Sequence, residues 1–196
     1  GLMIVASLRA LGFLGKIIAI ARYTFQAEKA KMLGANVILT ERDPQKLYDA
    51  IAEATGAHLF QPTLSKRVVY GNCGPDLIFD CVATEDSMDD SIRLVKSNGK
   101  IIVVGLGYTK TKRIDWSIPV YKELQIVGTM MYGLAEINGK PQDLFEFALK
   151  YLETHQTLFA GLVTHTFTLE NWKTALECTA SKGKNKAIKV VFDYRE

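Results

Sequence analysis

Short apolar runs rich in β-branched residues alternate along the chain with segments of helical periodicity. We expect the apolar runs to be buried strands and the periodic segments to be covering helices. The expected strands cover residues 16–21, 36–40, 76–82, 100–105 and 124–131, and the expected helices cover 1–11, 25–33, 43–54, 84–96 and 141–155. This alternation predicts an α/β fold with a doubly wound parallel sheet.

The regular alternation of buried strands and helices stops after the helix that ends near residue 155. A strand over 162–169, a helix over 170–181 and a strand over 187–194 form a shorter appendage. We therefore divide the chain into a sheet domain over 1–157 and a C-terminal segment over 158–196. The stretches 56–74 and 106–123 lack a clear period, so the first is expected to be a loop or loosely helical insertion and the second an irregular polar segment.

The first helix begins the sequence without a strand before it. In a nucleotide-binding βαβ unit such a helix follows a strand and a glycine-rich turn, with its N-terminus at the pyrophosphate. Gly1 stands where the last glycine of a G-x-G-x-x-G fingerprint would be, and Ala21 follows at the spacing of the ribose-reading position. We expect a chain truncated just inside this fingerprint at its first strand; the alternative is a natural helical start.

The junction after the strand over 16–21 suggests which dinucleotide would bind. An acidic residue at this place hydrogen-bonds the 2′-hydroxyl of NAD, whereas an arginine accommodates the 2′-phosphate of NADP. The chain has Ala21 and then Arg22. A guanidinium binds a phosphate dianion well, whereas an aspartate at residue 21 would repel that phosphate. The junction favours NADP(H) over NAD(H); the alternative is a solvated arginine after a strand.

Composition narrows the class of protein. The 196 residues are 48% hydrophobic and 23% charged with a net charge of +3, which fits an ordinary globular protein. The basic residues are scattered, so nucleic acid is not an expected partner. We also expect no membrane span, because no apolar run is long enough. The three cysteines show no zinc or disulfide spacing and suggest a reducing compartment, so the expected location is cytoplasmic.

Several segments together carry a family resemblance. The runs IIAIARYTFQAEKAKMLGANVI, DLIFDCVAT, LVKSNGKIIVVGLG, KELQIVGTM and LVTHTFTLENWKTALE resemble the medium-chain dehydrogenase/reductase superfamily in its zinc-type alcohol dehydrogenase-like branch. The resemblance implies a Rossmann-type domain and a C-terminal return to a catalytic domain. It also implies that the GroES-like catalytic domain, with the zinc ligands, would precede Gly1, so this chain carries no expected catalytic or metal-binding residue and would be inactive alone.

The resemblance assigns cofactor-binding roles to particular positions. Gly1 resembles the last fingerprint glycine, and Arg22 resembles the 2′-phosphate partner. The residues that the resemblance places at the dinucleotide are Gly1, Ala21, Arg22, Tyr23, Gln26, Cys81, Val82, Ala83, Val104, Gly105, Leu106, Thr129, Met130, Met131 and Lys189. Lys189 stands where the family has a basic residue reaching the pyrophosphate.

The implied function is the cofactor-binding share of an NADP(H)-preferring oxidoreductase that moves a hydride between an alcohol or carbonyl substrate and nicotinamide. Two alternatives stay open: the zinc-free quinone or enone reductase branch, and a non-catalytic nucleotide-binding scaffold. A sheet binding S-adenosylmethionine is disfavoured, because it would need an acid near Ala21. The family forms dimers through the strand over 124–131, so we expect a homodimer.

Overall fold

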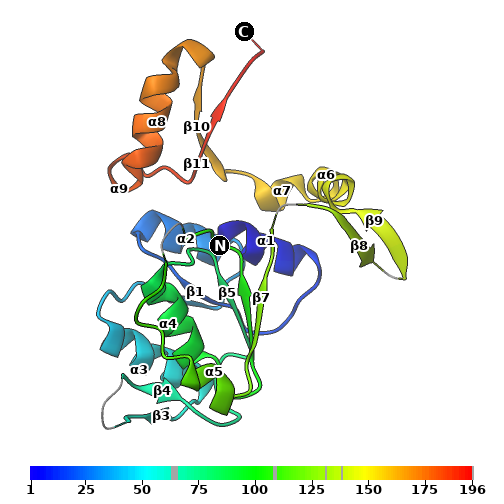
Figure 1. The fold of residues 1–196 in the computed structure, drawn as a ribbon. Coiled ribbons are helices and arrows are strands. Elements are labelled where there is room, and N and C mark those ends of the chain that lie inside the picture. Colours follow the sequence, from blue (N-terminus) through cyan, green and yellow to red (C-terminus); the bar gives the residue numbers. More distant parts are fainter. Residues whose placement is uncertain (63–65, 108–109, 131, 138, 196) are drawn as a thin grey trace. The chain divides into compact units, whose positions relative to one another are not determined.

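The computed structural model describes residues 1–62, 66–107, 110–130, 132–137 and 139–195. It divides into two compact units. The first unit holds Gly1 and Glu41–Met131, and the second unit holds Leu2–Thr40 and Tyr132–Glu196. Figure 1 shows the course of the chain through both units. Each unit is described by itself below.

The second unit begins with two helices and two parallel strands. The elements are α1 (Leu2–Ala10), β1 (Ile18–Ile20), α2 (Thr24–Met32) and β2 (Val37–Leu39), and Ile18 is opposite Val37 in the parallel pair. After α2, Gly34 has a φ of +99°, a left-handed conformation that suits glycine and ends the helix. The elements match the predicted order, although the strands are shorter than expected.

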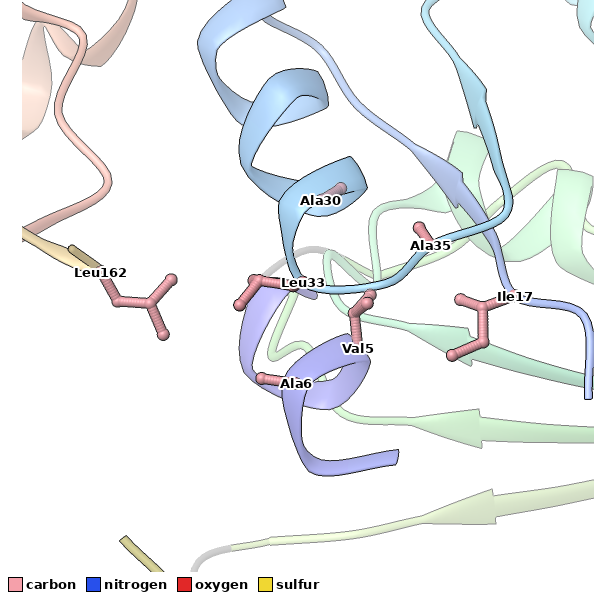
Figure 2. Packing of buried hydrophobic residues seen from close by; sticks show 7 residues of the cluster. All are labelled: Val5, Ala6, Ile17, Ala30, Leu33, Ala35 and Leu162. Atoms are coloured by element: carbon pink, nitrogen blue, oxygen red, sulfur yellow. The ribbon is translucent and has the colours of Figure 1, made fainter. Parts of the chain in front are cut away.

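A small apolar core holds these elements together. Ala6 from α1, Ala30 from α2 and Ile17 before β1 are buried together in one cluster. Leu162, from much later in the chain, belongs to the same cluster, as Figure 2 shows. Small residues at Ala6 and Ala30 let the two helices approach closely, since neither carries a side chain beyond Cβ. Of the nine residues of α1, only Val5 and Ala6 are buried, so the helix packs through a narrow apolar face.

The first unit contains a three-stranded parallel sheet in the order β5-β6-β7. Its strands are β5 (Leu77–Asp80), β6 (Lys100–Val103) and β7 (Gln125–Gly128), and its helices are α3 (Pro44–Thr55), α4 (Glu85–Leu94) and α5 (Ser117–Tyr121). Asp43 and Thr84 cap α3 and α4 through their side-chain oxygens, as the sequence indicates. A core of Val68, Ile92, Val95, Ile101 and Ile118 joins α4 and α5 to the sheet.

Two stretches of the first unit differ from the expectation. The insertion over 56–74 contains an antiparallel pair, β3 (Leu59–Phe60) and β4 (Val68–Val69), and both valines of β4 are buried. The polar stretch over 106–123 contains α5, whose Ile118 enters the core. Both elements are too short to produce a period in the sequence, and they form because tertiary packing buries their few apolar side chains.

The remainder of the second unit is more varied than predicted. It comprises β8 (Leu134–Ile137), β9 (Lys140–Asp143), α6 (Leu144–Thr154), α7 (Gln156–Phe159), β10 (Val163–Phe167), the 3₁₀ turn η1 (Leu169–Asn171), α8 (Trp172–Ala180), α9 (Lys182–Asn185) and β11 (Lys189–Phe192). The pair β10 and β11 is parallel, and β8 and β9 form a hairpin that the sequence did not predict. Pro141 therefore lies in a strand, and α6 begins only after its cap Asp143.

Candidate functional site

The parallel strands of the first unit end at a common edge, which is where open α/β sheets bind ligands. The predicted cofactor residues of this unit follow directly after the three strands: Cys81, Val82 and Ala83 after β5, Val104, Gly105 and Leu106 after β6, and Thr129 and Met130 after β7. Met131 lies outside the described residues. The sheet therefore brings these predicted residues to one edge.

Asp80, the last residue of β5, organises this edge. Its carboxylate is 5% exposed and accepts hydrogen bonds from the backbone N–H groups of Val82 (2.9 Å) and Ala83 (2.8 Å). The hydroxyl of Ser87, in the first turn of α4, donates to the same carboxylate at 2.9 Å. Ala83 has a φ of +54°, an uncommon value for a residue with a side chain. The buried carboxylate therefore fixes the backbone of the loop after β5.

The backbone of Asp80 also ties that loop to the next one. Its carbonyl oxygen accepts hydrogen bonds from the N–H groups of Val104 (2.8 Å) and Gly105 (2.9 Å). The two loops are so close that a Cβ on Gly105 would lie 2.5 Å from the backbone nitrogen of Val82. Gly105 must therefore be glycine. The sequence analysis missed Asp80, although a polar residue ending an apolar strand was a visible signal.

Large apolar side chains at the strand ends are exposed. Val82 is 59% exposed, Leu106 61% and Met130 75%. Gly1 belongs to the same unit, and a Cβ placed on it would lie 3.9 Å from the sulfur of Cys81. An edge that offers apolar side chains beside loops fixed by hydrogen bonds suits a ligand with flat rings and polar linkers.

The junction after β1 lies in the second unit. Ala21 is 8% exposed, and its N–H donates to the carbonyl of Leu39 at 2.9 Å, which continues the pairing of β1 with β2. Arg22 is exposed, and its guanidinium lies over the ring of Tyr23 at 5.6 Å from the ring centroid. Tyr23 in turn stacks on Phe25 with a centroid distance of 5.4 Å. The junction therefore presents a positive charge supported by aromatic rings.

The last two predicted positions also lie in the second unit. Gln26 is in the first turn of α2, where its N–H donates to the carbonyl of Tyr23 at 3.1 Å. Lys189 is exposed at the start of β11. The structure thus brings the predicted residues of the first unit to its strand ends, whereas those of the second unit lie after β1, in α2 and in β11.

Lys122 is a buried cation that sequence analysis did not identify. Its side chain is fully buried, and Nζ donates to the carbonyls of Ile92 (2.9 Å) and Arg93 (3.0 Å) at the end of α4. Burial, with repulsion from the Arg93 guanidinium, lowers the pKa of Lys122 from 10.5 to about 7. The amine closes the carboxyl end of α4, where carbonyl groups lack partners within the helix.

Neither a metal centre nor a membrane segment is found in the described part of the chain. Among the residues with described positions, no three His, Cys, Asp or Glu side chains are grouped to hold a metal ion. The described helices are also too short or too polar to cross a bilayer. The described residues therefore do not fit a zinc site.

Comparison with characterised proteins finds polyol dehydrogenases. The chain is 31% identical over 111 residues to D-arabinitol dehydrogenase 1 of Uromyces fabae, covering 56% of this chain and 29% of that protein. It is 26% identical over 165 residues to the sorbitol dehydrogenase of Homo sapiens, covering 83% of this chain and 38% of the relative. The chain thus corresponds to less than half the length of these relatives.

Solved structures share the fold. A short chain alcohol dehydrogenase from Escherichia coli CFT073, complexed with NADH, superposes with a TM-score of 0.71 at 19% identity, covering 98% of this chain and 49% of that one. Acetophenone reductase from Geotrichum candidum, in complex with NAD, gives a TM-score of 0.64 at 20% identity, covering 100% and 46%. These similarities confirm the predicted Rossmann-type architecture.

A family model settles the relationship that the sequence suggested. The model described as zinc-binding dehydrogenase matches residues 1–154, most of the chain. The medium-chain dehydrogenase resemblance drawn from the sequence is thereby confirmed. With its parallel strands, ordered strand-end loops and alcohol dehydrogenase-like neighbours, the chain belongs to the zinc-binding dehydrogenase family, as a Rossmann-type cofactor-binding part.

Proposed function

We propose that this chain is the cofactor-binding part of an NADP(H)-preferring oxidoreductase acting on an alcohol or its carbonyl counterpart. The observation that carries the cofactor preference is the junction after β1. Ala21 offers no carboxylate to a ribose 2′-hydroxyl, and the exposed Arg22 guanidinium offers two parallel N–H donors to a phosphate. The solved neighbours named above hold NADH or NAD, so the preference is a property that we propose for this chain's own residues.

We propose that the strand-end edge of the first unit also contacts a nicotinamide cofactor. Val82, Leu106 and Met130 present apolar surface to its rings. Bound there, the nicotinamide would supply a carbon that gives or accepts a hydride. The chain's own contribution would be to bind the cofactor and to fix its orientation.

The substrate class follows from the relatives. D-arabinitol dehydrogenase 1, L-idonate 5-dehydrogenase and sorbitol dehydrogenase are named for polyhydroxylated substrates. We therefore propose an alcohol carbon of a hydroxylated small molecule as the hydride donor. Many dehydrogenases share one fold, so the fold does not identify the substrate. The substrate is selected by the catalytic residues that contact it.

Substitution of Arg22 by alanine should abolish the preference for NADPH. In the complete gene product, we expect NADPH to bind at least tenfold tighter than NADH, a difference of about 1.4 kcal/mol. Arg22→Ala should weaken NADPH binding to the level of NADH and leave NADH almost unchanged, because only NADPH carries the 2′-phosphate. Titration followed by nicotinamide fluorescence measures both dissociation constants.

Lys31→Ala is a matched control, because Lys31 is an exposed cation in the last turn of the same helix that Arg22 precedes. It should leave both dissociation constants unchanged. Equal binding of NADH and NADPH to the wild type would contradict the proposed preference. Binding of neither cofactor would contradict the dehydrogenase proposal and favour the non-catalytic scaffold instead.

We also propose that the protein forms a homodimer through β7. Within the described residues, β7 pairs with β6 on one side only, and Val127 on this strand is 42% exposed. An exposed strand edge readily pairs with a second copy. Light scattering after size-exclusion chromatography should give twice the protomer mass, and Val127→Lys should shift it toward the monomer. A wild-type monomer at micromolar concentration would refute the proposal.

A further inference from the structure

The short helix α9 contacts the junction that we assign to the cofactor's 2′-phosphate. Both belong to the second unit, although about 160 residues separate them in sequence. A Cβ placed on Gly183 in α9 would lie 2.6 Å from Cε1 of Tyr23 and 3.0 Å from its Cζ. The backbone of α9 therefore rests directly on the aromatic ring over which the Arg22 guanidinium lies.

Positive charge is concentrated on both sides of this contact. Lys182 and Lys184 flank Gly183 and are exposed, and Arg22 is exposed on the Tyr23 ring. None of these three cations forms an ion pair with a carboxylate of the described residues. The segments 181–187 and 21–27 contain no Asp or Glu. An uncompensated group of cations of this kind favours a multiply charged anion.

We propose that Lys182 and Lys184 of α9 complete the 2′-phosphate site together with Arg22. This inference rests on the proposed NADP(H) preference and adds to it a specificity-determining contribution from the end of the chain. A phosphate monoester carries close to two negative charges at neutral pH, more than one guanidinium balances. Two ammonium groups that leave the backbone on either side of the Tyr23 contact would supply the remaining positive charge.

The close contact of α9 with the Tyr23 ring depends on Gly183, which lies between the two lysines. Any side chain at Gly183 would overlap the Tyr23 ring, so alanine there must displace α9 or the ring. Alanine is otherwise the better helix former, so α9 itself should persist. Gly183→Ala is therefore a way to move the lysines without removing their charge.

The double substitution Lys182→Gln with Lys184→Gln tests the proposal in the complete gene product. We expect the dissociation constant of NADPH to rise about tenfold and that of NADH to change less than twofold. The control is Lys140→Gln with Lys150→Gln, which removes the same charge from exposed positions in β9 and α6. Unchanged NADH binding also verifies that each variant is folded.

Gly183→Ala should produce the same selective loss for NADPH, with Gly133→Ala as its control. Gly133 has open space where a Cβ would be and no left-handed backbone conformation.

The salt dependence of NADPH binding should also become shallower in the double lysine variant, because fewer cations then contact the phosphate.

The outcomes separate this inference from the proposed function. If wild-type protein prefers NADPH and Arg22→Ala abolishes the preference while the lysine double variant retains it, α9 has no part in the site and the inference is overturned. If the lysine variant loses NADH and NADPH equally, the lysines contact a part common to both cofactors, which also overturns it. If wild-type protein shows no preference, both the inference and the proposed cofactor choice fail.

Discussion

Replacing Asp80 by alanine should destabilise the protein by about 3 kcal/mol and weaken binding of both nicotinamide cofactors at least tenfold. The substitution leaves the N–H groups of Val82 and Ala83 and the hydroxyl of Ser87 without their acceptor in a buried place. The loop after β5 would then lose the bonds that hold its left-handed residue. Urea unfolding and fluorescence titration of the complete gene product measure the two effects.

Two further variants make the Asp80 result specific. Asp80→Asn keeps one side-chain oxygen for the backbone donors and should have a smaller effect, so a loss equal to that of alanine would point to the charge near the start of α4. Asp76→Ala removes an 82% exposed carboxylate that pairs with Lys96, and should change stability by less than about 0.5 kcal/mol. If Asp80→Ala matched Asp76→Ala, the proposed organising role of Asp80 would be wrong.

Stability should rise with pH between 7 and 10.5 because of Lys122. The pKa of this amine falls from 10.5 to about 7 on folding, so in this range the unfolded chain binds the proton that the folded protein has lost. Stability increases with pH wherever the unfolded state binds more protons, here by at most about 1.4 kcal/mol per pH unit. Below pH 7 the Lys122 amine is protonated in both the folded and the unfolded state. The buried charge then lowers the free energy of unfolding by its full amount.

Lys122→Met isolates this contribution. Methionine keeps the length of the buried stem but cannot titrate, so the free energy of unfolding should lose most of its increase between pH 7 and 9. Lys100→Met is the control, since Lys100 is exposed in β6, and its pH dependence should match that of the wild type. Urea unfolding at several pH values makes the comparison. An unchanged pH dependence in Lys122→Met would show that the buried amine does not titrate there.

The elements with strong local signals could be predicted from sequence. The β-branched run before Ala21, the Asp43-Pro44 start of α3 and the Thr84 cap of α4 each specify a strand or a helix start locally. The α/β class followed from the order of these signals, the family followed from the resemblance of several segments to known dehydrogenases, and both are confirmed. The elements missed, such as β3, β4 and α9, are only two to four residues long and carry no period.

The candidate site was predictable only in part. Strand-end positions such as Val82 and Leu106 came from the family resemblance, and they agree with the rule that ligands bind at the carboxyl ends of parallel strands. The role of Asp80 could not be read in the same way, because its partners are set by burial and by backbone geometry of the loop. The contact of Tyr23 with Gly183 joins segments far apart in sequence, so no local pattern could reveal it.

By itself, the sequence determined the class of fold and the charge at the junction after β1, because apolar periodicity, capping residues and the Ala21-Arg22 pair are local properties of the chain. The family came from the resemblance of several whole segments to known dehydrogenases. The tertiary structure alone decided which polar groups are buried and which distant residues meet. Asp80 and Lys122 are buried and held by specific hydrogen bonds, and Gly183 of α9 lies against the ring of Tyr23. Such properties depend on how the whole chain packs, because burial and long-range proximity are not local properties of the sequence.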